Sequence, residues 1–149
     1  MPCELRPEPF DPWLILAEHQ AGLAPGQYGA SSVFVGTMRD MNQQTRVQAM
    51  TLEHYPGMTE KHLATICEEA ESRWELLDTL IIHRVGQIQI NDPIVLVAAW
   101  SAHRGGAMEA CRYLIEELKH RAPFWKQEQL SDSDENRWVS GNTKYEDHA

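Results

Sequence analysis

Lysine, arginine and histidine side chains gather in one stretch of an otherwise acidic chain. The sequence holds 13 Lys+Arg against 22 Asp+Glu, a formal net charge of -9. Residues 103–126, HRGGAMEACRYLIEELKHRAPFWK, instead hold five Lys or Arg against three Glu, and therefore carry a net +2. A local cation cluster on an anionic protein predicts a pocket for a small anion, whereas a nucleic-acid surface needs a broad basic face.

Lys119 is the residue of this stretch best suited to proton or acyl chemistry. We expect a helix that begins near Gly105 and Gly106 and ends before Pro123. Its apolar positions share one stripe at helical spacing: Ala107, Ala110, Cys111, Leu114, Ile115 and Leu118. Lys119 lies at the edge of this stripe, where partial desolvation and nearby cations predict a lowered amine pKa. A lysine that moves protons or acts as a nucleophile near neutral pH needs such a pKa. The alternative is a surface lysine whose stem lies on apolar atoms while its amine stays in water.

Four further side chains complete the candidate site: Arg39, His103, Arg104 and Lys126. Arg39 follows a strand expected to end at Gly36, and the His-Arg pair follows an apolar strand. Arginine binds phosphate or carboxylate through two parallel hydrogen bonds, and histidine can donate a hydrogen bond or carry a proton. Each alone is compatible with an ordinary solvated side chain. Their spacing in the sequence leaves open whether they converge.

Composition predicts one globular domain in a reducing compartment. The chain has 149 residues, 42% hydrophobic and 23% charged, as soluble single domains do. Cys3, Cys67 and Cys111 are widely spaced, which predicts reduced core thiols of a cytoplasmic protein. The sequence contains no CxxC pair, so neither a zinc site nor a redox dithiol is expected. No apolar run approaches the ~20 residues of a membrane span, and the N-terminal residues lack the pattern of a signal peptide.

The expected order of elements is helix, two strands, helix, two strands, helix, strand, which predicts a mixed α/β or α+β domain. We expect strands over 31–36 and 46–55 to form a hairpin that carries Arg39. The apolar run 93–102 predicts a central strand covered on both faces. His54 and His83 fall within strand patterns and are interpreted as buried or edge histidines rather than ligands. No dinucleotide, phosphate-loop or nucleophile-elbow motif occurs.

The chain divides by pattern into three parts of a single domain. Residues 1–27 form an N-terminal helix and loop, 28–128 form the core, and 129–149 form a polar tail. Trp138 and Val139 are the apolar anchor of this tail, expected to dock on the body or on a second subunit. Residues 40–45, DMNQQT, are polar and expected to be mobile. Whether they order on binding stays open.

Six segments together resemble the large, catalytic subunit of molybdopterin synthase: FVGTMRD (34–40), LEHYPGM (52–58), HRVG (83–86), SAHR (101–104), LKHRAPFWKQE (118–128) and RWV (137–139). The resemblance runs from about Ser31 to Val139. It implies the α/β-hammerhead fold and sulfur transfer onto cyclic pyranopterin monophosphate, which forms the molybdopterin dithiolene. It also implies a small ubiquitin-like partner carrying sulfur as a C-terminal glycine thiocarboxylate, and a central homodimer within a heterotetramer. No metal or nucleotide cofactor is implied.

The resemblance assigns roles residue by residue. Arg39, His103 and Arg104 match positions that hold the substrate's charge, Lys119 matches the lysine at the thiocarboxylate tail, and Lys126 matches the second lysine of the site. Thr37, Met38, Gln127 and Glu128 match neighbouring substrate-contact positions with less weight. Arg137 matches a residue that reaches a site across the dimer. The chain departs from the family pattern at Met38, Gly106, Met108 and Gln127, which puts the shape of the pocket in question.

Two other functions compete with catalysis of sulfur transfer. One is a non-catalytic adaptor that binds a ubiquitin-like tail, which Lys119→Ala would distinguish from the enzyme. The other is a phosphate-ester hydrolase with a basic pocket, for which the sequence offers no nucleophile and no set of metal ligands.

Overall fold

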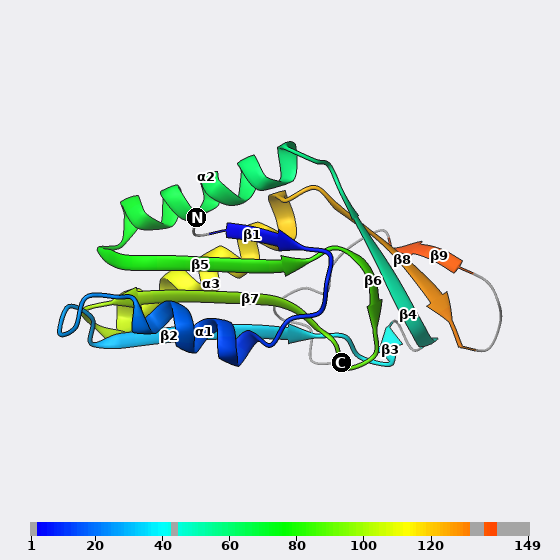
Figure 1. Ribbon diagram of the computed structural model, residues 1–149. Helices are drawn as coiled ribbons and strands as arrows, with labels where there is room; N and C mark the ends of the chain where they lie inside the picture. The colour runs from blue at the N-terminus through cyan, green and yellow to red at the C-terminus, as the bar shows by residue number, and fades with distance from the viewer. Residues whose placement is uncertain (1–2, 43–44, 132–135, 140–149) are drawn as a thin grey trace.

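A four-stranded sheet lies at the centre of the computed structural model, which describes residues 3–42, 45–131 and 136–139 (Figure 1). Its strand order is β1 (Cys3–Arg6), β5 (Leu76–Arg84), β7 (Pro93–Ser101) and β2 (Ala30–Thr37). β1 runs parallel to β5, and the other neighbours are antiparallel. β1 was not expected from the sequence, because four residues with alternating polarity provide too short a pattern.

The central position of β7 confirms the prediction that the apolar run 93–102 contains a central strand covered on both faces. Val95, Val97 and Ala99 face one hydrophobic cluster, whereas Leu96 and Trp100 face the other. All five side chains are buried. Successive side chains of a strand point to opposite faces, so only a strand covered on both sides is apolar throughout.

Three helices of the described chain cover this sheet. α2 (Met58–Arg73) and α3 (Arg104–Arg121) pack on one face, and α1 (Pro12–Ala21) packs on the other (Figure 1). α1 begins where the Asp11 carboxylate accepts hydrogen bonds from two backbone N–H groups of its first turn. α3 ends at Arg121, before the proline at 123, as the sequence predicts. The prediction of a mixed α+β fold with about three helices is confirmed.

A second sheet stands at one end of the first. It consists of β3 (Met41–Asn42), β4 (Thr45–His54), β8 (Phe124–Leu130) and β9 (Asn136–Val139), with β6 (Gly86–Gln89) paired to β4. β3, β6 and β9 were not expected from the sequence.

The expected hairpin between residues 31–36 and 46–55 is wrong. β2 pairs with β7, whereas β4 pairs with β8 and β6. The register of β2 shifts between Gly36 and Thr37, and the next backbone N–H, of Met38, donates to the carbonyl of Asp92. The chain therefore leaves the first sheet at this point and passes to the second.

The C-terminal segment docks through its backbone. β9 pairs with β8, with Val139 opposite Lys126 and Trp138 opposite Gln127. Trp138 is 55% exposed, whereas Val139 is half-buried, so the valine is the part of the expected anchor that contacts the body. Residues 43–44, 132–135 and 140–149 lie outside the described chain, and with them most of the expected tail and part of the polar segment 40–45.

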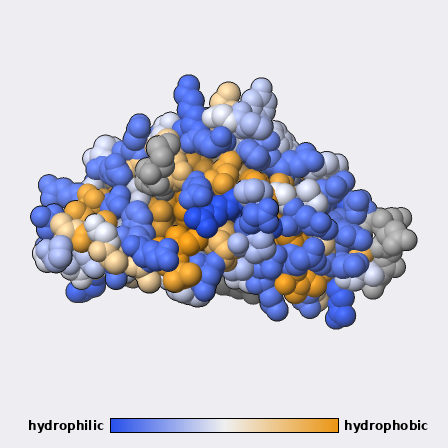
Figure 2. All heavy atoms as spheres, viewed as in Figure 1, coloured by the Kyte–Doolittle hydropathy of each residue, from blue (hydrophilic) through white to orange (hydrophobic). Residues whose placement is uncertain are grey.

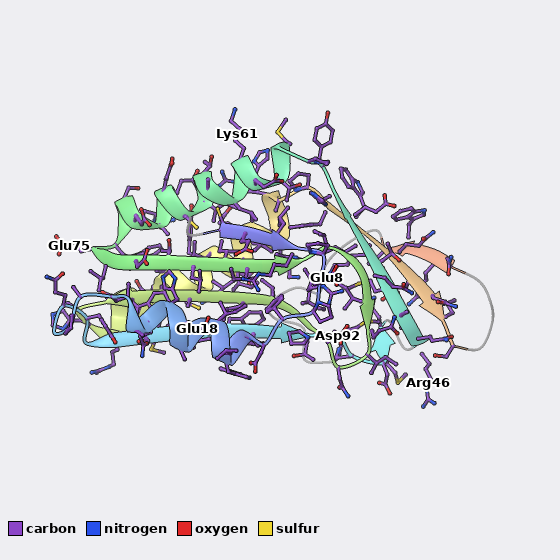
Figure 3. All side chains as sticks on the ribbon, viewed as in Figure 1. Glu8, Glu18, Arg46, Lys61, Glu75 and Asp92 are labelled. Carbon is purple, nitrogen blue, oxygen red and sulfur yellow. The ribbon has the colours of Figure 1, made fainter. Side chains whose placement is uncertain are left out.

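Acidic side chains are spread over the outside of the fold. Glu8, Glu18 and Glu75, labelled in Figure 3, are exposed and come from three different parts of the chain. Most of the face shown in Figure 2 is polar, with separate apolar patches. No helix of the described residues is long and apolar enough to cross a membrane.

Candidate functional site

Three of the candidate cations meet where the two sheets join. Lys119 comes from the last turn of α3, Lys126 from β8, and Arg39 from the segment after β2. All three line one hollow of about 200 Å³, which we call the first hollow. The buried Glu128 of β8 also lines it. The convergence that the spacing in the sequence left open is therefore observed for one arginine and two lysines.

The two lysines also line a second hollow, of about 300 Å³. Val139 of β9 is the third residue common to both hollows. The remaining walls of the second hollow include the apolar residues Leu52 and Phe124. The two lysine side chains therefore lie at the boundary of two adjoining hollows.

The environment of Lys119 favours its neutral form. Burial, and then the positive charge of Lys126, lower the pKa of the Lys119 amine to about 7. Burial also lowers the pKa of Lys126, and the Glu128 carboxylate partly offsets this effect. The cause lies in the end of α3: Leu118 is fully buried, so the next residue starts at the edge of the core. The expected direction of the Lys119 shift agrees with the structure.

Glu128 joins three strands at the wall of the first hollow. Its carboxylate accepts a hydrogen bond from Arg137 Nε at 2.9 Å and one from Asn42 Nδ2 at 2.9 Å. Arg137 Nη2 also donates to the backbone carbonyl of Asn42 at 2.9 Å. These bonds connect β3, β8 and β9. Arg137 is thus engaged within its own chain, and its reach across a dimer stays a prediction.

The weaker candidates divide between the hollow and the surface. Thr37 and Met38 line the first hollow, where the buried methionine side chain takes up space. Gln127 lines neither hollow, because it alternates with Lys126 and Glu128 along β8 and points to the opposite face.

His103 and Arg104 lie at the other end of α3 and line neither hollow. Fifteen residues of helix separate Arg104 from Lys119, which at ~1.5 Å per residue is roughly 22 Å. A single chain therefore does not bring these two candidates to the hollows, and their part in the site stays a prediction. A continuous helix fixes this separation. The separation also follows from the helix length that the sequence predicts.

Sequence reasoning missed several residues of the site. Phe34, Met41 and Met50 line the first hollow but carry no pattern that separates them from core residues. His83 was interpreted as a buried, satisfied histidine, and it is 2% exposed with Nδ1 2.7 Å from the carbonyl oxygen of Arg84. It nevertheless lines the second hollow. Alternation along β5 puts it on the same face as Ile81, under α3, and this was the available signal.

Comparison with known proteins identifies the family. The family model described as MoaE protein matches residues 5–121. The chain belongs to the MoaE protein family. This MoaE-family chain is 53% identical over 113 residues to the molybdopterin synthase catalytic subunit of Ralstonia nicotianae. That alignment covers 76% of this chain but 63% of the relative, so the chain spans less than two thirds of that protein's length.

Solved structures of the family share the fold. Molybdopterin synthase from Staphylococcus aureus has a TM-score of 0.81 and 33% identity, and covers 92% of this chain and 96% of its own. A chain in the complex of subunits 1 and 2 of molybdopterin-converting factor from Helicobacter pylori has a TM-score of 0.78, with 94% and 91% coverage. At 20% identity, the latter supports the fold alone. The predicted resemblance and the fold that it implies are confirmed.

Proposed function

We propose that this chain is the catalytic subunit of a molybdopterin synthase. It moves sulfur from the C-terminal thiocarboxylate of a small ubiquitin-like partner to cyclic pyranopterin monophosphate, and so forms the molybdopterin dithiolene. The observation that carries this proposal is the placement of Lys119 and Lys126 in both hollows at once. A transfer between two separately bound molecules needs the reacting groups at such a boundary.

The two hollows suit the two reactants. Arg39 and the lysines give the first hollow the cationic lining that a cyclic phosphate requires. The second hollow offers apolar contacts from Leu52 and Phe124 beside the amines, which suits an extended peptide tail that ends in an anionic group. We assign the pterin to the first hollow and the tail to the second. Both reactants are anionic, so the two lysines that the hollows share reduce the repulsion between them.

Lys119 has the proton affinity that the reaction needs. With a pKa of about 7, its amine is present in both protonation states near neutral pH. Once the sulfur is bonded to the pterin, water adds to the carbonyl carbon of the partner's terminal glycine. The charged form of Lys119 stabilises the oxyanion that forms before the C–S bond breaks and a carboxylate is released. The neutral form accepts a proton released at the reacting centre. Lys126 contributes a second positive charge, which adds to the larger effect of burial in lowering the pKa of Lys119.

A second copy of the chain supplies His103 and Arg104 in this proposal. Both residues start α3, roughly 22 Å from Lys119 by helical rise, and the resemblance implies a central homodimer. In a twofold dimer the start of one α3 can lie near the end of the other, since each surface contacts its symmetry mate reciprocally. The heterotetramer then consists of one homodimer of this chain and two sulfur-carrier partners.

Reconstitution tests the proposed activity. The chain is incubated with thiocarboxylated partner and cyclic pyranopterin monophosphate, and dithiolene is assayed. We expect product from the wild type and its loss in Lys119→Ala, with partner binding preserved. Lys61→Ala is the matched control, because Lys61 is exposed on α2 and points away from the body (Figure 3). Partner binding without product from the wild type would favour the adaptor.

We also propose a cytoplasmic location. All three cysteines are buried free thiols, as is usual in compartments that keep thiols reduced.

A further inference from the structure

We propose that His83 is a positioning residue for Lys119: it presents an unprotonated Nε2 to the hollow that receives the partner's tail, in an orientation fixed by the Arg84 carbonyl and the Phe124 ring. The chemical role of Lys119 in this inference rests on the proposed function. The geometry of His83 does not.

The hydrogen bond of His83 determines its tautomer. Nδ1 lies 2.7 Å from the backbone carbonyl oxygen of Arg84. A carbonyl oxygen only accepts, so Nδ1 carries the proton and donates it. Neutral imidazole has one donor and one acceptor, and Nε2 therefore keeps its lone pair. Burial, followed by the charges of Lys119 and Lys126, lowers the pKa of His83 to about 3, so the ring is neutral at any physiological pH.

The ring has little freedom to turn. Its plane stacks on the ring of Phe124, with centroids 4.2 Å apart and an angle of 16° between the planes. Phe124 is the first residue of β8, the strand that also carries Lys126. His83 is therefore held between the end of β5 and the start of β8. Only 2% of its surface is exposed, although it lines the second hollow.

A neutral acceptor suits a hollow that binds an anion. His83 shares the second hollow with Lys119, Lys126 and His120, and no described residue that lines it is acidic. A carboxylate here would stabilise the ammonium form of Lys119 and repel the thiocarboxylate. Nε2 can accept one hydrogen bond from the amine without adding charge. The remaining hydrogen-bonding capacity of the amine is then directed toward the tail.

Two substitutions separate positioning from simple structural support. In His83→Gln, the amide oxygen reaches the place of Nε2 and keeps an acceptor there, but the donor to the Arg84 carbonyl is lost. In His83→Asn, the amide nitrogen matches Nδ1 and keeps that donor, but the acceptor toward the hollow is lost. We expect Gln to keep kcat within about threefold and Asn to lower kcat about ten- to a hundredfold, with little change in KM for the partner. The reverse order would assign His83 to structural support and overturn the inference.

A titration of Lys119 provides a readout that does not depend on activity. The chain has four lysines (Lys61, Lys119, Lys126 and Lys144), so NMR of lysine-labelled protein can resolve each amine, with Lys119→Ala for assignment. Loss of the acceptor destabilises the ammonium form, so the pKa of Lys119 is expected to fall further in His83→Asn and to stay near the wild-type value in His83→Gln. An unchanged Lys119 pKa in a folded His83→Asn protein would overturn the inference. Failure of the wild type to form dithiolene would instead count against the proposed function and leave this titration valid.

Discussion

Lys119 and Lys126 come from a helix and a strand that are joined by a tight turn, and both side chains line the same two hollows. The charge of Lys126 lowers the pKa of Lys119, in addition to the larger effect of burial. The turn at Ala122 and Pro123 brings the chain back so that the two amines face common space. The two lysines are therefore electrostatically coupled, and the charge of Lys126 lowers the proton affinity of Lys119.

Removal of the Lys126 charge is expected to raise the pKa of Lys119. In Lys126→Gln the repulsion that disfavours the Lys119 ammonium is lost, while burial remains. The pKa is expected to lie above about 7 but below the usual 10.5 of lysine. The limb of the pH–rate profile that reports the ionisation of Lys119 is expected to move to higher pH. The NMR titration of Lys119 is expected to move in the same direction. Lys61→Gln is the control. A titration that stays in place, or that moves to lower pH, contradicts the electrostatic coupling.

Arg137→Ala is expected to lower stability more than an ordinary surface substitution. It removes the ion pair of the buried Glu128 carboxylate with Arg137, in which the Nε to Oε1 distance is 2.9 Å and the acid side chain is 7% exposed. Breaking such a pair costs about 2–3 kcal/mol, measurable as a lower free energy of unfolding in urea. Arg46→Ala is the matched control, because Arg46 is exposed at the second sheet (Figure 3). A double variant with Glu128→Gln is expected to recover part of the loss. Equal losses for Arg137→Ala and Arg46→Ala would show that the pair adds no stability.

Acid sensitivity is expected to depend on Glu69. Hydrogen bonds from Arg121, and then from Tyr113, lower the pKa of this carboxyl from 4.5 to about 2 in the folded chain. The folded pKa lies below the unfolded one, so the stabilisation is fully present above pH 4.5 and is lost as the pH falls toward 2. The difference in unfolding free energy between wild type and Glu69→Gln is therefore expected to shrink across this window in urea titrations. Glu68→Gln, at an exposed neighbouring position, is the control. A difference that stays constant from pH 6 to pH 2.5 contradicts this assignment.

The helices and the central strand could be predicted because local patterns define them. The apolar residues of α3 repeat at helical spacing, which indicates one buried face. The unbroken apolar run of β7 indicates a strand buried on both faces. The pairing of β2 with β7 could not be predicted, because strand partners distant in sequence leave no trace in either strand alone. The short strands β1, β3, β6 and β9 have two to four residues, too few to establish a period.

The candidate site was predictable in part for a similar reason. Lys119 could be placed at the boundary of the core from helical geometry, and its lowered pKa follows from that position. Arg39 was correctly expected just beyond a strand end, although its partner strand was wrong. The network of Glu128 with Asn42 and Arg137 joins residues far apart in sequence and was not expected. The length of α3 separates His103 and Arg104 from Lys119 within one chain, so their part in the site stays a prediction.

Mixed dimers test whether Arg104 acts in the site of the other subunit. Lys119→Ala and Arg104→Ala are each expected to be inactive alone. If one site combines Lys119 of one chain with Arg104 of the other, a dimer of one variant with the other contains one intact site and one doubly impaired site. With random pairing, half of the dimers are mixed and each has one working site of two, so about a quarter of wild-type activity is expected to return. Co-expression with two affinity tags isolates the mixed dimers, for which about half of wild-type activity is expected. The control is a mixed dimer of Lys119→Ala with Lys126→Ala, which is not expected to recover activity. No recovery from the Arg104 pair would rule out a site that combines Lys119 of one chain with Arg104 of the other.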